Sequence, residues 1–223
     1  MPKPGALSAR AKVVLVDDCP MVRERLAQAI NHERDLIVCG EAEDCRSALE
    51  VIARVLPELA IIDLALGNSH GLELIKDLRV RWPKLLILVL SARDECCYAE
   101  RAVRAGARGF IAKREPTRNI LAAVRAVLGG QLYLSPAMNA HIASKAVARR
   151  QGAPGPSVQS LADRELEVFE WIGRGFSTQE IAERLRLHLK TVETYRCRIK
   201  DKLRLKDAHE LLRHAIEWRR LDL

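Results

Sequence analysis

The chain has 223 residues, enough for one large domain or two small ones. Hydrophobic residues make up 48% and charged residues 30%, which excludes a disordered chain, and only 4% are aromatic, which predicts aliphatic cores. The 37 Lys and Arg residues against 29 Asp and Glu residues give a net charge of +8. This favours an anionic partner but does not distinguish nucleic acid, a membrane surface or an acidic protein.

The sequence carries no sign of export or membrane anchoring. The first residues, MPKPGALSARA, lack the apolar core of a signal peptide, and no stretch reaches the roughly 18 apolar residues that span a bilayer. The six cysteines are scattered, with no CxxC pair and no histidine at metal-ligand spacing, so neither a disulfide framework nor a zinc site is indicated. We expect a cytoplasmic protein with reduced thiols and no contact with a membrane.

Residues 12–130 alternate short apolar runs with amphipathic segments. Several runs are apolar at consecutive positions, as strands buried on both faces must be. We predict strands at residues 12–18, 36–41, 59–64, 85–91 and 109–112. The alternation predicts an α/β domain in which five βα units form a doubly wound parallel sheet, with right-handed crossovers placing helices on both faces.

After the Gly129–Gly130 pair the strand pattern stops, and residues 131–160 are predicted to be a helix followed by a flexible linker. Ser135 and Pro136 favour a helix start, and residues 151–160 are rich in Pro, Gly and Ser. Residues 161–223 show only helical patterns. We predict a second, all-α domain with helices near residues 164–173, 177–186, 190–203 and 207–219.

Polar side chains stand at the carboxyl ends of four predicted strands, where doubly wound sheets place their chemistry. Asp17 and Asp18 close the first strand, Asp63 the third and Ser91 the fourth, and Lys113 follows the fifth. One such residue alone is usually a cap, but five at matching strand ends predict a site.

Three carboxylates brought together would repel one another and raise one another's pKa, which favours a hard cation such as Mg²⁺ as their ligand. A carboxylate beside Mg²⁺ can attack an activated phosphoryl group. Asp63 is the candidate nucleophile because it lies centrally. Lys113 would neutralise the phosphoryl oxygens, and the Ser91 hydroxyl would donate a hydrogen bond to them.

Residues 12–130 resemble the receiver domains of bacterial two-component response regulators, on the segments VLVDDCPMVRERL, IIDLALGNSHGLELIKDLR, VLSARDE and GARGFIAKRE. The resemblance implies a flavodoxin-like fold in which a sensor histidine kinase phosphorylates Asp63. It also implies a Mg²⁺ site made by Asp17, Asp18, Asp63 and the backbone carbonyl of Ala65, and a switch made by Ser91, Phe110 and Lys113. For the Phe110 side chain alone, a plain core position is an equally good interpretation.

The loop at residues 66–71 departs from the receiver pattern because it lacks the usual proline. Gly67 makes this loop less rigid, which bears on the lifetime of the phosphorylated state rather than on the site itself.

Two helices joined by a tight turn, residues 177–186 and 190–203, suggest a helix-turn-helix, although short helix pairs occur in many bundles. Residues 186–206 contain eight basic and two acidic side chains. A helical wheel buries Val192, Ile199 and Leu203. The opposite face carries Lys190, Thr194, Cys197 and Asp201, flanked by Glu193 and Arg198. The basic residues that surround this face make it suited to phosphates: Arg196, Arg198, Lys200, Lys202, Arg204 and Lys206.

Residues 161–203 also resemble the DNA-binding domain of the LuxR/NarL family, on Arg164–Glu165, Gly175, Glu180–Ile181–Ala182, Lys190–Thr191–Val192 and Lys202–Leu203. The resemblance implies that the helix from Lys190 enters the major groove of double-stranded DNA and that the last helix packs against its twin in a homodimer on a two-fold operator. We expect phosphate contacts from Lys190, Thr191, Tyr195, Arg198 and Lys202. Base contacts are expected from Glu193, Thr194 and Cys197.

Arg186 and Arg204 stand where that family commonly has Gly or Asn after a helix. If these positions are left-handed, each arginine carries backbone strain.

The sequence therefore predicts a transcription regulator that is not an enzyme and whose dimerisation and promoter binding are controlled by phosphorylation of Asp63. One alternative is a DNA-binding regulator that does not depend on phosphorylation. Another is a flavodoxin-like phosphatase or phosphotransferase. Against the enzyme, Asp63 is followed by Leu64 and Ala65, so there is no second carboxylate two residues on to act as acid and base.

Overall fold

The computed structural model describes residues 10–140 and 157–221, apart from residues 68, 94 and 137. The chain divides into two compact units, residues 1–138 and residues 139–223. The first unit is α/β and the second is helical, as predicted. Residues 141–156, which include most of the helix and linker predicted within residues 131–160, lie outside the described residues.

The first unit is built on a five-stranded parallel sheet with the strand order β2-β1-β3-β6-β7. The strands are β1 (Ala11–Val16), β2 (Leu36–Ala42), β3 (Leu59–Ile62), β6 (Leu86–Ser91) and β7 (Gly109–Ala112). Every residue of β3 is buried, because the strand is apolar throughout and is covered on both faces. The five predicted strands are confirmed, and β1 and β3 end before Asp17 and Asp63.

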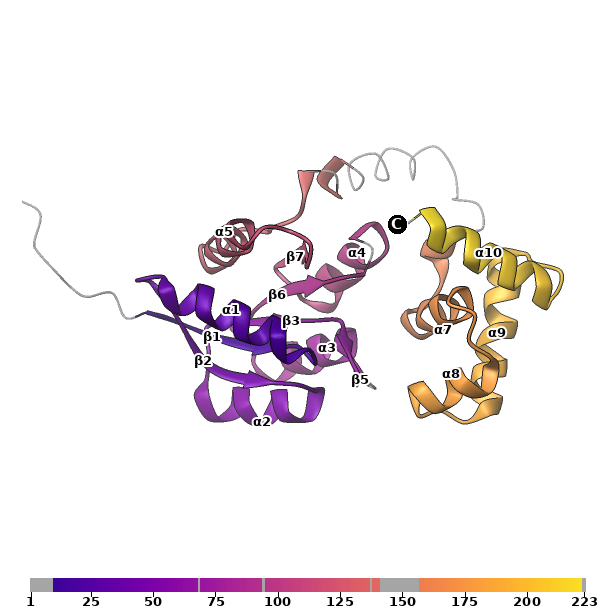
Figure 1. Ribbon diagram of the computed structural model, residues 1–223, viewed down its shortest axis with the longest axis horizontal. Helices are drawn as coiled ribbons and strands as arrows, with labels where there is room; N and C mark the ends of the chain where they lie inside the picture. Colours follow the sequence, from indigo (N-terminus) through magenta and orange to yellow (C-terminus); the bar gives the residue numbers. More distant parts are fainter. Residues whose placement is uncertain (1–9, 68, 94, 137, 141–156, 222–223) are drawn as a thin grey trace, which may run out of the picture. The chain divides into compact units, whose positions relative to one another are not determined.

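Five helices cover the two faces of the sheet (Figure 1). They are α1 (Pro20–His32), α2 (Cys45–Val55), α3 (Gly71–Arg81), α4 (Glu95–Ala105) and α5 (Thr117–Leu128). On one face α1 contacts α5, and on the other α3 contacts both α2 and α4. Leu26 and Ile30 of α1 pack with Val124 of α5 on Val13 and Leu15, so the core is aliphatic as the composition predicted.

The chain after Asp63 forms a small antiparallel hairpin, β4 (Ala65–Leu66) and β5 (Ser69–His70), before α3 begins. Gly71 follows directly and lies against the backbone of the Asp63 segment. A Cβ at Gly71 would stand 2.6 Å from the carbonyl oxygen of Asp63, so a side chain there would displace the segment that carries Asp63.

The segment after α5 returns along the edge of the sheet. The backbone N–H of Phe110 donates to the carbonyl of Tyr133 at 2.9 Å, and the N–H of Tyr133 donates to the carbonyl of Arg108 at 3.0 Å. Leu134 and Met138 are buried, and the N–H of Ser135 donates to the Glu95 carboxylate of α4 at 3.1 Å. The chain is thus held to β7 and α4 until it leaves this unit.

The second unit contains η1 (Val158–Ser160), α7 (Asp163–Gly173), α8 (Thr178–Leu185), α9 (Leu189–Leu203) and α10 (Ala208–Leu221). Ser177 begins α8 with a reciprocal cap: its Oγ accepts from the N–H of Glu180, and the Glu180 carboxylate accepts from the N–H of Ser177. Gly173 allows α7 and α10 to approach closely. η1 falls within the segment that the sequence predicted as a linker. Val158 is buried in this unit, so the end of that segment packs with the helices.

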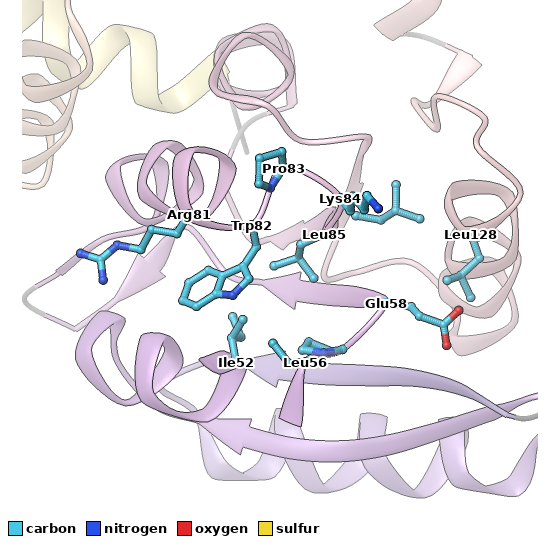
Figure 2. Close-up of a pocket in the computed structure, with 11 residues that line it drawn as sticks. Ile52, Leu56, Glu58, Arg81, Trp82, Pro83, Lys84, Leu85 and Leu128 are labelled. Carbon is cyan, nitrogen blue, oxygen red and sulfur yellow. The ribbon is translucent and has the colours of Figure 1, made fainter. Parts of the chain in front are cut away.

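A cavity of about 600 Å³ opens at the amino-terminal ends of β3 and β6 (Figure 2). Trp82 and Leu85 lie on one side of it, and Ile52 and Leu56 on the other. It is at the opposite end of these strands from Asp63 and Ser91. In the part of the chain that the structure describes, no helix has the length and apolar character needed to cross a bilayer.

Candidate functional site

The ends of β1, β3 and β7 bring Asp17, Asp63 and Lys113 together. The Lys113 ammonium lies 2.6 Å from Oδ2 of Asp17 and 2.7 Å from Oδ2 of Asp63. Both carboxylates are 3% exposed. The three side chains converge because the parallel register aligns the carboxyl ends of their strands, as predicted.

The carboxylates of Asp17, Asp18 and Asp63 form a cluster that suits a hard cation. One oxygen from each lies within 4.8 Å of the others. Asp63 Oδ1 is buried and accepts no hydrogen bond from the residues that the structure describes. A buried oxygen without a donor calls for an explanation, and a metal ion ligated by oxygen atoms supplies one. The residues therefore fit Mg²⁺, which binds through one or two carboxylates and retains water ligands.

The electrostatics of the site couple Asp63 to Lys113. Burial raises the pKa of Asp63 above its ordinary value, and this outweighs the opposing effect of Lys113. Burial alone would lower the pKa of Lys113, but its hydrogen bonds to Asp17 and Asp63 raise it. The ammonium is therefore held in its charged form between two carboxylates.

Ser91 and Phe110 lie on neighbouring strands next to this cluster. Both are fully buried, and the N–H of Lys113 donates to the carbonyl of Ser91 at 2.8 Å. Ser91 Oγ accepts from the N–H of Arg93 at 3.2 Å, and Arg93 in turn donates to the hydroxyl of Tyr98 at 2.7 Å. Buried Tyr98, on α4, extends the group and was not predicted, because its contact with Arg93 depends on how α4 packs.

Two contacts hold the segments that follow Asp17 and Asp63 in the chain. The N–H of Gly67 donates to Oδ2 of Asp18 at 3.0 Å, and Gly67 has a φ of 55°, in the left-handed region that favours glycine. Arg23 donates to the backbone carbonyl of Asp17 at 2.6 Å. Ala65 lies in β4, two residues after Asp63. The loop that lacks proline is thus held by the hairpin and by Asp18.

Helix α9 divides into a buried and an exposed face as the helical wheel predicted. Val192 and Ile199 are 0% exposed and Leu203 is 6% exposed. Thr191 and Tyr195 are half-buried at the margins. The exposed residues of the opposite side are Lys190, Glu193, Thr194, Cys197, Arg198 and Asp201. The Thr194 hydroxyl donates to the carbonyl of Lys190 at 2.8 Å, which leaves its methyl group for other contacts.

Three basic residues of this region have structural features of their own. Lys202 lies 2.6 Å from Oε2 of Glu165 on α7, and the Glu165 side chain is only 4% exposed. Arg186 and Arg204 end α8 and α9 with φ of 51° and 56°, so both occupy the left-handed positions that the sequence suggested. The partner of Lys202 was not predicted, because Glu165 is 37 residues away in sequence.

Comparisons with known proteins match the two units to two families. Residues 13–125 match the response regulator receiver domain, and residues 159–215 match the bacterial regulatory proteins of the luxR family. The transcriptional activator protein ExaE of Pseudomonas putida is 35% identical, over 92% of this chain and 95% of that protein. The oxygen regulatory protein NreC of Staphylococcus carnosus is 32% identical, over 95% of this chain and 99% of that protein.

Solved structures share the fold. RcsB from Salmonella enterica serovar Typhimurium, bound to the promoter rprA with the phosphomimetic BeF3-, has a TM-score of 0.66 and 22% identity over 92% of this chain and 98% of that one. A LuxR-family response regulator from Aurantimonas has a TM-score of 0.59 and 29% identity over 62% of this chain and 99% of that one. The resemblance inferred from the sequence is confirmed. This chain belongs to the two-component response regulators that join a receiver domain to a LuxR-type DNA-binding domain.

Proposed function

We propose that Asp63 accepts a phosphoryl group from a sensor histidine kinase and that this modification controls promoter binding by the helical unit. The first part rests on the different surroundings of the two carboxylate oxygens of Asp63. Oδ2 of Asp63 is held by Lys113, whereas Oδ1 is buried and accepts no hydrogen bond from the described residues. Asp17 and Asp18, with the backbone carbonyl of Ala65, would complete a Mg²⁺ site around Asp63.

The transfer exchanges one phosphorus bond for another. A carboxylate oxygen of Asp63 forms a bond to phosphorus as the bond from phosphorus to the kinase histidine nitrogen breaks, and that nitrogen keeps the electron pair. Lys113 neutralises charge on the phosphoryl oxygens, and the Ser91 hydroxyl turns to donate to one of them. When bound, Mg²⁺ supplies further positive charge to these oxygens.

Acetyl phosphate tests this assignment without the kinase. We expect the full chain, incubated with acetyl phosphate and Mg²⁺, to gain one phosphoryl group by intact mass, and Asp63→Asn to gain none. Glu58→Gln, which changes a carboxylate at the other end of β3, is the matched control and should react as wild type does. Modification of Asp63→Asn to the wild-type extent would contradict the assignment.

The second part of the proposal is that α9 enters the major groove of a two-fold operator. The basic residues around its exposed face, eight of them within residues 186–206, support this function, as does the structure of RcsB bound to promoter DNA. Lys190, Thr191, Tyr195 and Arg198 would contact phosphates, and Glu193, Thr194 and Cys197 would face base edges. We further propose that α10 pairs with its twin in the homodimer, and that the protein works in the cytoplasm.

Phosphorylation would reach the output through the end of the receiver sheet. Ser91 and Phe110 are buried on β6 and β7, and the Phe110 N–H donates to Tyr133 in the segment that leaves the unit. Engagement of Ser91 by the phosphoryl group would shift Phe110 and the face formed by α4, β7 and α5. The phosphorylated and unphosphorylated states would then differ in the contact that Ser91 makes, and a switch requires such a difference.

The relatives are named as a transcriptional activator and an oxygen regulatory protein, and we infer a regulatory role here as well. A phosphatase or phosphotransferase would show repeated turnover on small phosphoesters. We expect no turnover beyond one phosphoryl group per chain.

A further inference from the structure

The ion pair between Lys202 and Glu165 joins the last turn of α9 to the first turn of α7. Lys202 Nζ lies 2.6 Å from Oε2 of Glu165. The same oxygen accepts from the N–H of Ala162 at 2.7 Å, the residue that begins α7. Glu165 is 3% exposed. One buried carboxylate oxygen therefore holds both the start of one helix and the end of another.

The burial of Glu165 makes this contact hard to give up. Removing the partner of a buried charge leaves an uncompensated charge, which costs far more than breaking an exposed pair. If Lys202 turned toward a DNA phosphate, the buried Glu165 carboxylate would lose the ammonium that pairs with it. Moreover, the Glu165 charge cancels much of the attraction that the Lys202 ammonium would exert on a phosphate.

The pair lies at one end of α9, where it can affect the orientation of the exposed face of that helix. Val192, Ile199 and Leu203 form an apolar seam along the buried side. An apolar seam is non-directional and specifies rotation and tilt less strictly than a short charge-assisted hydrogen bond does. A polar contact at one end of α9 therefore adds a directional constraint on the orientation of the helix that carries Thr194 and Cys197.

We propose that Lys202 is a positioning residue that acts through Glu165 to set the orientation of α9 on DNA, and that it does not bind a phosphate. This role differs from the phosphate contact that the sequence suggested, and it rests on the proposed DNA binding by α9. It places a determinant of base recognition on α7, at a residue that never meets DNA. Neither Lys202 nor Glu165 is expected to change the number of phosphates that the protein neutralises.

The test compares the two roles through the salt dependence of binding. The probe is a duplex selected by the wild-type full chain from a random oligonucleotide pool, alongside a duplex of the same composition in scrambled order. Affinity for both is measured over a range of salt concentrations. The variants are Lys202→Met, Glu165→Asp and their double variant, and Arg198→Met is the control for a phosphate contact. Circular dichroism checks that each variant is folded at the assay temperature.

Glu165→Asp is the decisive variant because it preserves charge and shortens the side chain by one methylene. We expect it to weaken binding to the selected duplex by about tenfold, the scale of one misplaced base contact, and to leave binding to the scrambled duplex nearly unchanged. Lys202→Met should do the same with an unchanged salt slope, and the double variant should lose little more than the worse single one. Arg198→Met should weaken both duplexes and lower the salt slope by about 0.9.

Two results would overturn the proposal. One is a fall of about 0.9 in the salt slope for Lys202→Met, with equal loss on both duplexes, which is the signature of a phosphate contact. The other is wild-type discrimination by Glu165→Asp. If Lys202→Met is not folded, Lys202→Arg replaces it. Because Lys202→Arg keeps a cation beside Glu165, it should discriminate between the selected and the scrambled duplex better than Glu165→Asp does. Failure of the wild-type chain to enrich any duplex would instead contradict DNA binding itself.

Discussion

Single side chains at the ends of the strands define the chemistry of the receiver unit. Asp17 and Asp63 share Lys113, and yet one oxygen of Asp63 accepts no hydrogen bond from the described residues. Three carboxylates, of which those of Asp17 and Asp63 are buried, leave an excess of negative charge against one ammonium. A cation should therefore stabilise the folded protein, and the carboxylates that ligate it should be identifiable one by one.

Magnesium should raise the free energy of unfolding of the wild-type chain. At ten times its dissociation constant, the increase should be about 1.4 kcal/mol. Asp18→Asn should show a smaller increase at the same concentration, whereas Asp77→Asn, an exposed carboxylate on α3, should behave as wild type. Denaturant unfolding with Mg²⁺ or with EDTA measures this. Equal stabilisation of all three proteins would exclude Asp18 from the site.

Arg204 tests the backbone strain at the end of α9. Its φ of 56° favours glycine, so Arg204→Gly should be more stable than Arg204→Ala by about 1 kcal/mol. Both variants lose the same charge, which makes the comparison independent of electrostatics. Thermal unfolding of the two proteins measures the difference. Greater stability of the alanine variant would show that no strain is stored there.

At the scale of elements, caps and close approaches position the helices that surround the sites. Asp44 begins α2 by accepting hydrogen bonds from the N–H and the hydroxyl of Ser47, each at 2.7 Å. Gly173 brings α7 against α10, with a Cβ position only 2.6 Å from the carbonyl oxygen of Ala215. Each feature gives a prediction about one helix.

The Asp44 cap should give α2 a pH-dependent stability. Its hydrogen bonds to Ser47 lower the pKa of Asp44 below the ordinary 3.8. The stabilisation is therefore fully present above pH 3.8 and is lost as the pH falls through the lowered value. Asp44→Ala should cost about 1 kcal/mol at neutral pH and much less in acid. Asp44→Asn, which keeps the cap without the charge, should remove this pH dependence when unfolding is followed from pH 7 downward.

Gly173→Ala should separate α7 from α10. The added methyl meets backbone rather than a flexible side chain, so we expect a loss of about 1–3 kcal/mol. Gly129→Ala is a suitable control, because its Cβ would meet nothing closer than 3.3 Å. Chemical denaturation followed by tryptophan fluorescence reports the change, since Trp218 of α10 lies 5.6 Å from the ring of Phe169 of α7. Equal stability of both variants would contradict close packing at Gly173.

Sequence patterns predicted the elements well because they depend on local periodicity. The five strands follow from consecutive apolar residues, and the buried face of α9 follows from the spacing of Val192, Ile199 and Leu203. What local patterns do not encode is contact between distant positions. The partner of Lys202, the contact of Gly67 with Asp18 and the pairing of Tyr133 with Gly109 depend on tertiary packing.

At the scale of the whole molecule, the net charge of +8 is distributed unevenly between the two units. Residues 186–206 carry eight basic and two acidic side chains, on and around the helix proposed to enter the groove. The receiver unit instead gathers acidic side chains around Asp63. The central claim is that chemistry at Asp63 governs the binding of DNA by the helical unit.

An operator titration tests this claim most directly. The full chain and Asp63→Asn are each titrated against a duplex selected from a random pool, with Mg²⁺ and with or without acetyl phosphate, and the apparent affinity is measured. The account predicts that acetyl phosphate raises the affinity of the wild-type chain by about tenfold or more, a coupling of roughly 1.4 kcal/mol, and leaves Asp63→Asn unchanged. Equal affinity of the wild-type chain with and without acetyl phosphate would contradict it and identify a regulator that binds DNA independently of phosphorylation.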